Sequence, residues 1–368
     1  MENLVIIFGG NSPESDVSVI TAMQAAAAAD KGKYKLYPVY YSGDRFYLGR
    51  TFEVSEYADF DRKNAKIVTF SDGNMIICKN ALSKKTVKVH CVLNCCHGGD
   101  GENGNLAGYF ETTLVPYTSA KPLAAAVSMD KYLSKIVFSG LGLDVVPAVL
   151  ATEKNFSEKL FEAEEKIGYP LIVKPVDLGS SIGVKIAKDE KQAGEAAKVA
   201  FAFSEKVLLE KCLENFTELN VAAMRTLDGS VMVSPVERPV FKGEIFDFAD
   251  KYLAGEKGGL EEAGREFPAK IPEAVAEKAQ NIAKKIYEEL EFSGPVRIDF
   301  MLSGGTLYVG EVNSVPGSLS AYLLEAAGIS FEKLVDEAVL FARAEFERKK
   351  GLQKSFESAI LKGFDIKK

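Results

Sequence analysis

The sequence of 368 residues contains no tryptophan, only two histidines and five cysteines. An odd number of irregularly spaced cysteines argues against a disulfide framework in a chain of this length. Cys95, Cys96 and His97 stand together, but no second Cys/His pair occurs at the spacing of a structural zinc site. We therefore expect reduced cysteines, with Cys91, Cys95 and Cys96 as small residues at the end of a buried strand.

Long apolar runs and an excess of positive charge are lacking as well. The N-terminus has no basic segment, and its apolar run at 4–8 is too short for a signal peptide. No stretch approaches the roughly 20 apolar residues of a transmembrane helix. Lys and Arg number 45 against 52 Asp and Glu, so the net charge is −7 and no broad basic surface for nucleic acid or membrane is expected. These absences predict a cytoplasmic protein with small-molecule partners.

The length suggests two or three domains, each with its own core. In the first part of the chain, apolar strands alternate with an alanine-rich helical segment, a βαβ pattern that predicts an α/β domain with a parallel sheet. The expected elements are strands at 4–8, 34–41 and 87–94 and a helix at 17–29. The glycine-rich runs at 9–10 and 98–104 fall at the carboxyl ends of strands, where ligands bind in such sheets.

Two further domains are expected, which gives the division 1–121, 122–212 and 213–368. The second domain has a glycine-serine turn between two strands, and the third has two adjacent strands after a long amphipathic helix. The expected elements are a helix at 128–139, strands at 170–175 and 207–210, a helix from about 190, strands at 218–225, 231–240, 296–302 and 306–312, and helices at 274–290 and from 331 onward.

The strongest chemical signal is a pair of neighbouring strands that carry oxygen ligands. Glu311 and Asn313 lie two residues apart, so they point to one face, where Asp299 of the partner strand can meet them. Two carboxylates and an amide oxygen suit Mg²⁺. Arg297 shares a face with Asp299 and can neutralise an anion that develops beside the metal. The alternative is an ordinary salt-bridged hairpin, but the sequence Asn-Ser-Val-Pro-Gly directly after a strand carboxylate favours a metal site.

Lysines at the ends of apolar segments form a second signal. Lys174 follows a strand and precedes the glycine-serine loop at 177–183, whose backbone N–H groups could wrap phosphate oxygens. Lys131 opens a helix. A lone lysine is usually solvated, but the position of Lys174 favours phosphate binding, although the loop does not match the Walker pattern. At Glu210 and Lys211 a buried strand ends in charge, which suits an adenine edge or, equally, an ordinary strand end.

Taken together, these segments resemble the D-alanine–D-alanine ligase family within the ATP-grasp superfamily. The matching segments occur in the family's order across nearly the whole chain, at 9–18, 97–104, 116–118, 128–131, 173–183, 210–211, 251–253 and 297–317. The resemblance implies an ATP-grasp fold with an N-terminal Rossmann-like domain. It also implies a ligase that joins two D-alanines through an acyl phosphate for peptidoglycan synthesis, and a homodimer formed through the N-terminal domain.

The resemblance also implies roles for individual residues. Glu14 binds the ammonium of the first amino acid, and His97 lies near its carboxylate. Ser180 and Tyr252 join Glu14 in a triad that closes the site, while Arg297 and the Gly317 N–H form the oxyanion hole. The implied ATP contacts are Lys131, Lys174, Ser181, Glu210, Lys211, Leu213, Glu218 and Lys251. Two Mg²⁺ ions, with Mn²⁺ as an alternative, are held by Asp299, Glu311 and Asn313.

The segment after Gly317 departs from the family pattern. Direct register places Tyr322 where the family has a serine that holds the carboxylate of the second amino acid, with Leu323 next to it. Ser318 or Ser320 could take over that contact. Three readings therefore stay open: a D-Ala–D-Ala ligase, a ligase with another acceptor such as D-serine or D-lactate, and a nucleotide-binding module without catalysis. The intact set of metal ligands and lysines argues against the third.

Overall fold

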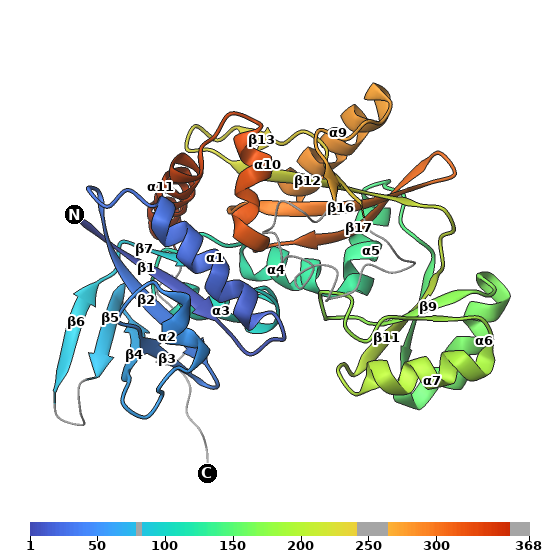
Figure 1. The fold of residues 1–368 in the computed structure, drawn as a ribbon, viewed down its shortest axis with the longest axis horizontal. Helices are drawn as coiled ribbons and strands as arrows, with labels where there is room; N and C mark the ends of the chain where they lie inside the picture. Colours follow the sequence, from blue (N-terminus) through green and yellow to red (C-terminus); the bar gives the residue numbers. More distant parts are fainter. Residues whose placement is uncertain (79–82, 241–263, 354–368) are drawn as a thin grey trace, which may run out of the picture.

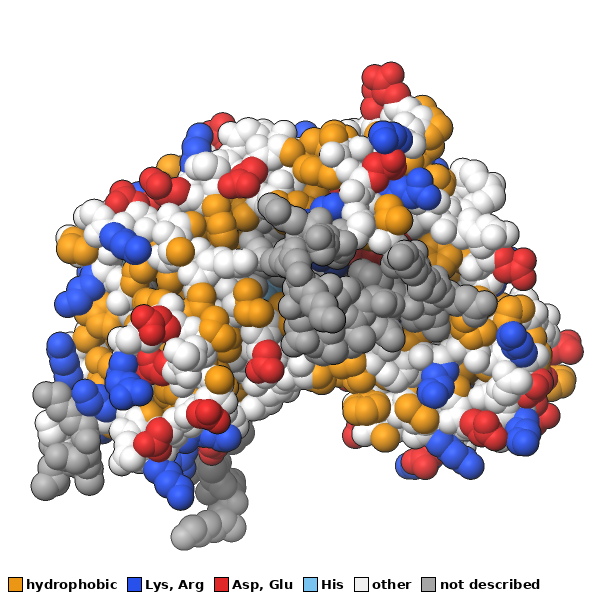
Figure 2. Space-filling view, in the orientation of Figure 1, with side chains coloured by type: hydrophobic (Ala, Val, Ile, Leu, Met, Phe, Trp, Pro, Cys, Tyr) orange, Lys and Arg blue, Asp and Glu red, His pale blue; other side chains and the backbone are white. Residues whose placement is uncertain are grey.

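The computed structural model describes residues 1–78, 83–240 and 264–353. Three regions surround a common centre: an N-terminal sheet with its helices, a smaller sheet near the middle of the chain, and a third sheet with the C-terminal helices (Figure 1). Among the described residues, no helix is long and apolar enough to cross a membrane. On the face drawn in Figure 2, acidic and basic side chains are interspersed over all three regions.

The N-terminal sheet has seven strands in the order β6-β5-β4-β3-β2-β1-β7. The strands are β1 (Glu2–Gly9), β2 (Tyr34–Ser42), β3 (Arg45–Leu48), β4 (Lys66–Ser71), β5 (Asn74–Cys78), β6 (Lys84–Lys88) and β7 (Cys91–Asn94). β1 pairs in parallel with β2 and β7, as the βαβ pattern predicts, whereas β3 to β6 add an antiparallel extension. The turn Asp72-Gly73, with φ of 47° and 72°, supplies the positive φ angles of a tight hairpin.

The single strand expected at 87–94 is wrong, because two strands share that segment. β6 pairs with β5 at one edge of the sheet, and β7 pairs with β1 at the other. Between them, the Val89 N–H donates to the Gly73 carbonyl and the His90 N–H donates to the Asn3 carbonyl, both at 3.0 Å. The two edges therefore approach each other here, a long-range arrangement that an apolar run cannot reveal.

The N-terminal region contains α1 (Ser15–Ala28), α2 (Val54–Ala58), the 3₁₀ turn η1 (Gly99–Gly101) and α3 (Asn105–Thr112). The helix expected at 128–139 is interrupted by Asp130 and forms two helices, α4 (Pro122–Met129) and α5 (Lys131–Gly140). The Asp130 side chain accepts hydrogen bonds from the N–H groups of Tyr132 and Leu133, both at 3.0 Å. This N-cap starts α5 at Lys131.

The central region has a four-stranded antiparallel sheet in the order β10-β9-β11-β8, with two helices packed on one face. Its elements are β8 (Ala148–Thr152), η2 (Glu153–Asn155), α6 (Phe156–Lys166), β9 (Leu171–Pro175), β10 (Lys185–Ala187), α7 (Glu190–Phe201) and β11 (Lys206–Lys211). Leu171, Val173, Val207 and Leu209 form the face under α6 and α7. Side chains alternate along a strand, so Lys174 and Glu210 lie on the opposite face.

The third sheet, in the order β13-β12-β16-β17, packs against α9. Its region contains β12 (Thr217–Arg225), β13 (Val231–Val233), β14 (Arg238–Pro239), β15 (Arg265–Glu266), α9 (Glu273–Glu289), β16 (Val296–Ser303), β17 (Thr306–Asn313), η3 (Gly317–Ser320), α10 (Ala321–Glu325) and α11 (Phe331–Lys350). The strand expected at 231–240 is wrong: β13 pairs with β12, whereas β14 pairs with β15.

One apolar core joins the two ends of the chain. It combines β1, α1 and β7 with η3, α10 and α11. Val339 of α11 and Leu319 of η3 are buried in it together with Phe8 of β1. This shared core fixes the turn after β17 against the loops that follow β1 and β7. All five cysteines are free thiols, and Cys91, Cys95 and Cys96 are fully buried, as the sequence predicts.

Candidate functional site

The predicted metal ligands lie on one face of the β16–β17 pair. Asp299 stands opposite Glu311, and Arg297 stands opposite Asn313. Gly310 forms a β-bulge between them, because the ladder shifts after Asp299. A Cβ atom at Gly310 would lie 2.8 Å from the Asp299 carbonyl oxygen. The bulge changes the alternation, so that Val309 and Val312 both face the core and Glu311 and Asn313 face away from it.

Cations neutralise both carboxylates of this face. Arg297 donates two hydrogen bonds to Asp299, from Nε at 2.7 Å and from an Nη atom at 2.8 Å. Asn313 Nδ2 donates to Asp299 Oδ2 at 3.0 Å. Lys131 of α5 reaches across, with its Nζ 3.3 Å from Glu311 Oε2. The described residues contain no cluster of three His, Cys, Asp or Glu side chains that could hold a metal. The donors here are two carboxylates and an amide, all hard oxygen ligands, which fits Mg²⁺.

The glycine-serine loop meets the N-terminal region at Glu14. The Ser180 hydroxyl donates to Glu14 Oε1. Two glycines enclose the other oxygen: a Cβ atom would lie 2.8 Å from Glu14 Oε2 at Gly98 and 3.0 Å from it at Gly179. Gly98 has a φ of 63°, so glycine suits its backbone as well as the space. The structure thus brings Glu14 and Ser180 together, with Ser181 beside them in the loop.

His97 is buried and binds backbone and side-chain groups with both ring nitrogens. Its Nε2 lies 2.8 Å from Thr21 Oγ1, and its Nδ1 lies 2.6 Å from the Val315 carbonyl oxygen. Burial lowers the pKa of His97 to about 4, so the ring is neutral at pH 7. Glu102 accepts the Val315 N–H at 2.7 Å and the Gly98 N–H at 2.8 Å. His97 and Glu102 therefore hold the backbone at Val315, just before Gly317.

The predicted nucleotide residues border the central sheet. Lys131 Nζ donates to the Leu178 carbonyl at 2.6 Å and thereby ties the glycine-serine loop to α5. Lys174 Nζ donates to Glu210 Oε1 at 2.6 Å. Lys211 is exposed and Leu213 is half-buried at the junction after β11. Glu218 stands opposite Met301, on the β12 face that carries the partner of Asp299.

The segment after Gly317 turns back on α1. Ser318, Leu319 and Ser320 have φ of 50°, 51° and 52°, three successive left-handed residues. The Ser318 N–H donates to Thr21 Oγ1 at 3.0 Å, and its hydroxyl donates to Gln24 Oε1 at 2.6 Å. Ser320 is buried. Because Thr21 and Gln24 belong to α1, these contacts fix the backbone next to Gly317 against that helix, and with it the Gly317 N–H.

Tyr322 and Leu323 point in different directions. Leu323 is fully buried in the core shared with α1 and α11. The Tyr322 hydroxyl donates to Glu237 Oε2 at 2.7 Å, and the Arg265 guanidinium lies 4.7 Å from the centre of its ring. Burial and the neighbouring Glu237 raise the pKa of Tyr322. Tyr322 thus occupies a polar cluster with Arg265 and Glu237.

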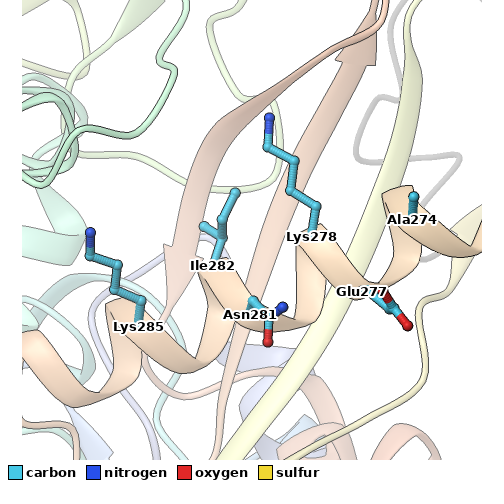
Figure 3. A pocket seen from close by; sticks show the side chains of 6 residues that line it. All are labelled: Ala274, Glu277, Lys278, Asn281, Ile282 and Lys285. Atoms are coloured by element: carbon cyan, nitrogen blue, oxygen red, sulfur yellow. The ribbon is translucent and has the colours of Figure 1, made fainter.

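Two predicted residues, Lys251 and Tyr252, lie outside the described residues. Sequence reasoning missed Lys135, which lies on α5 one helical turn after Lys131 and reaches Glu210. The signal was present, because residues four apart share a helix face. A depression of about 370 Å³ on α9 lies apart from the predicted site residues, since α9 supplies all the side chains that line it (Figure 3). It is lined by Ala274, Glu277, Lys278, Asn281, Ile282 and Lys285, none of which the sequence assigns to the site.

Comparisons with known proteins agree with this arrangement. Residues 3–120 match the family model described as D-ala D-ala ligase N-terminus, and residues 137–340 match that of the D-ala D-ala ligase C-terminus. A D-alanine--D-alanine ligase of Thermosipho melanesiensis is 36% identical, with 98% of this chain and 99% of the relative covered.

Solved structures of the same kind are similar as well. The VanG D-Ala:D-Ser ligase from Enterococcus faecalis has a TM-score of 0.79 at 26% identity, with 93% and 99% of the two chains covered. The D-alanine–D-alanine ligase from Helicobacter pylori has a TM-score of 0.74 at 27% identity, with 92% and 98% covered.

Proposed function

Because the chain belongs to the D-alanine–D-alanine ligase family, we propose that it joins two D-alanines, with conversion of ATP to ADP and phosphate, to make the dipeptide for peptidoglycan. The observation that carries the proposal is the convergence of three segments on one place. Glu14 meets Ser180 of the glycine-serine loop, Lys131 meets Glu311 of β17, and Arg297 lies beside Asp299. These contacts join all three regions of the molecule around one centre.

The reaction needs positioning and charge neutralisation. A carboxylate oxygen of the first D-alanine attacks the γ-phosphoryl group of ATP, which gives an acyl phosphate and ADP. The amine of the second D-alanine then attacks the activated carbonyl carbon, and phosphate leaves. The first step places several negative charges together, so it depends on cations fixed in place before the reaction.

The chain supplies these cations and donors at separate positions. Glu14 holds the ammonium of the first D-alanine through the negative charge of its carboxylate, which lies against Gly98 and Gly179. Lys131 and Lys174 bind the phosphates. Arg297 and the Gly317 N–H stabilise the oxyanion that forms at the attacked carbonyl. Asp299, Glu311 and Asn313 would hold Mg²⁺, which neutralises phosphate charge when bound.

The alternative function is a ligase that uses D-serine in place of D-alanine as the acceptor, and a specific observation favours it. The VanG ligase, whose name states a D-Ala:D-Ser product, is similar to this chain over 93% of its length. In addition, the serine of the family's acceptor pattern is replaced by Tyr322. The Tyr322 hydroxyl donates to Glu237, so it binds an acceptor carboxylate only if that bond opens.

Product analysis distinguishes the two acceptors. The purified protein is incubated with ATP, Mg²⁺ and equal concentrations of D-alanine, D-serine, D-lactate and glycine, and the products are identified by mass spectrometry. We expect the D-Ala dipeptide to dominate, with release of one ADP per dipeptide. A dominant mixed product would overturn the acceptor and keep the ligase chemistry, whereas no ADP release with any acceptor would overturn the function.

The proposed enzyme acts in the cytoplasm as a homodimer. ATP and five free thiols fit the reducing cytoplasm. The family resemblance supports a homodimer formed through the N-terminal region. Light scattering of the purified protein tests the assembly: a mass near that of one chain would contradict it.

A further inference from the structure

Three charged side chains meet on the face of the central sheet that lies opposite α6 and α7. Glu210 of β11 accepts a hydrogen bond from Lys174 of β9 on Oε1 and forms an ion pair with Lys135 of α5 through Oε2, each at 2.6 Å. Lys174 and Glu210 share a face of the sheet because Leu208 stands opposite Lys174, two residues from Glu210. The Glu210 side chain is 3% exposed and that of Lys135 is 8% exposed. Only Lys174 carries a role in the function proposed above that needs its ammonium group on the ligand.

The two lysines differ in how they are held. Lys135 is anchored twice, because its Nζ also donates to the Val146 carbonyl at 3.0 Å. Lys174, whose side chain is 17% exposed, lies at the end of β9 directly before the glycine-serine loop. Lys135 is therefore fixed inside the protein, whereas Lys174 is more exposed and adjoins the loop that we propose covers the phosphates.

The buried carboxylate of Glu210 needs a counter-ion that remains beside it when a ligand binds. An unpaired charge in the protein interior lowers the stability of the folded state. Removal of one partner of a buried ion pair is therefore destabilising, because the remaining charge has no counter-ion. Burial alone would raise the pKa of Glu210, but Lys174 and Lys135 offset burial and keep it lowered. If Lys174 moves toward phosphate, Glu210 remains ionised only because Lys135 stays.

We propose that Lys135 is a positioning residue of the ATP site: it is the permanent counter-ion of Glu210 and thereby frees Lys174 to bind phosphate. This inference rests on the proposed role of Lys174 in ATP binding. Without Lys135, the ammonium of Lys174 is the sole partner of a buried carboxylate, and ATP has to compete with Glu210 for it. Loss of Lys135 therefore weakens the binding of ATP and leaves the binding of D-alanine unchanged.

The test compares Lys135→Met with a matched lysine. Lys206 also joins β11 to α5, through Asp130 at 2.6 Å, but its side chain is 41% exposed and does not reach Glu210. We expect Lys135→Met to raise the KM for ATP at least tenfold, since a charge-assisted contact is worth about 1.5–3 kcal/mol, and to change the KM for D-alanine by less than about twofold. We expect Lys206→Met to leave both within about twofold, and Lys135→Arg to retain most of the ATP affinity.

A double-mutant cycle covers the case in which Lys135→Met does not fold, which circular dichroism reveals. In a Glu210→Gln background, Lys135→Met should change ATP affinity by less than about twofold, because the charge that it balances is gone. A tenfold loss in that background, or equal effects of Lys135→Met on both substrates, would overturn the inference. ATP affinity is measured by calorimetry without D-alanine, so that failure of the ligase function and failure of the role of Lys135 are separate results.

Discussion

The substitution Glu14→Gln tests the recognition of the first amino acid. The two carboxylate oxygens of Glu14 have different neighbours: Ser180 donates to Oε1, and Oε2 lies against Gly98 and Gly179, where a Cβ atom would approach it to 2.8 and 3.0 Å. Glutamine keeps the size and one acceptor oxygen but removes the charge that attracts an ammonium. A hydrogen bond between charged groups contributes about 1.5–3 kcal/mol, which corresponds to an increase in KM of about 10- to 150-fold at 1.4 kcal/mol per factor of ten.

The assay is steady-state ADP release with D-alanine and ATP varied separately. We expect the KM for D-alanine to rise by that factor and the KM for ATP to stay within about twofold. Asp16→Asn is the matched control, because it removes a negative charge from the first turn of the same helix at an exposed position. Equal increases for both substrates, or the same effect in Asp16→Asn, would show that Glu14 acts through folding or through the general charge of the helix end.

Three further predictions concern the rest of the site. Asp299→Ala should abolish turnover while the circular dichroism spectrum remains that of the folded wild type; near-normal activity at saturating Mg²⁺ would exclude Asp299 as a ligand. Gly98→Ala should lower activity at least tenfold, because its Cβ atom would lie 2.8 Å from Glu14 Oε2 on a backbone with a φ of 63°; an unchanged KM for D-alanine would argue against the enclosure of Glu14. Burial and the charge of Glu14 raise the pKa of Glu102 to about 7 from an ordinary value of 4.5, so ionisation of Glu102 destabilises the folded state. The free energy of unfolding from urea titrations should therefore lose the contribution of Glu102 as the pH rises from about 4.5 to about 7. Glu102→Gln should lack this loss, and parallel pH profiles of the two proteins would refute it.

The sequence predicted correctly which side chains of β16 and β17 share a face. Asp299, Glu311 and Asn313 were placed on one face from their spacing on two strands, because side chains alternate along a strand regardless of what surrounds it. The bulge at Gly310, which preserves this facing while both Val309 and Val312 stay buried, was not predicted. A bulge depends on the register between two paired strands, and the sequence of one strand does not specify that register.

Local signals also predicted part of the secondary structure. β1, β2, β9, β11 and β16 lie where apolar runs predicted them, because a buried strand requires apolar residues in any fold. The antiparallel extension of the N-terminal sheet, the passage from β6 to β7 and the separation of β13 from β14 were missed. The two strand separations involve distant partners, since β7 pairs with β1 and β14 pairs with β15, whereas the strands of the extension pair with their neighbours in the sequence.

What the sequence alone determined is the chemistry: which carboxylates, lysines and glycines are present, and which of them share a strand face or open a helix. Only the tertiary structure decided which charges neutralise one another. Lys135 meets Glu210, Lys131 meets Glu311, and Tyr322 packs with Arg265 and Glu237. Such pairs form because burial forces each charge or polar group to find a partner, and the partner is whichever group the packing of separate elements brings within reach.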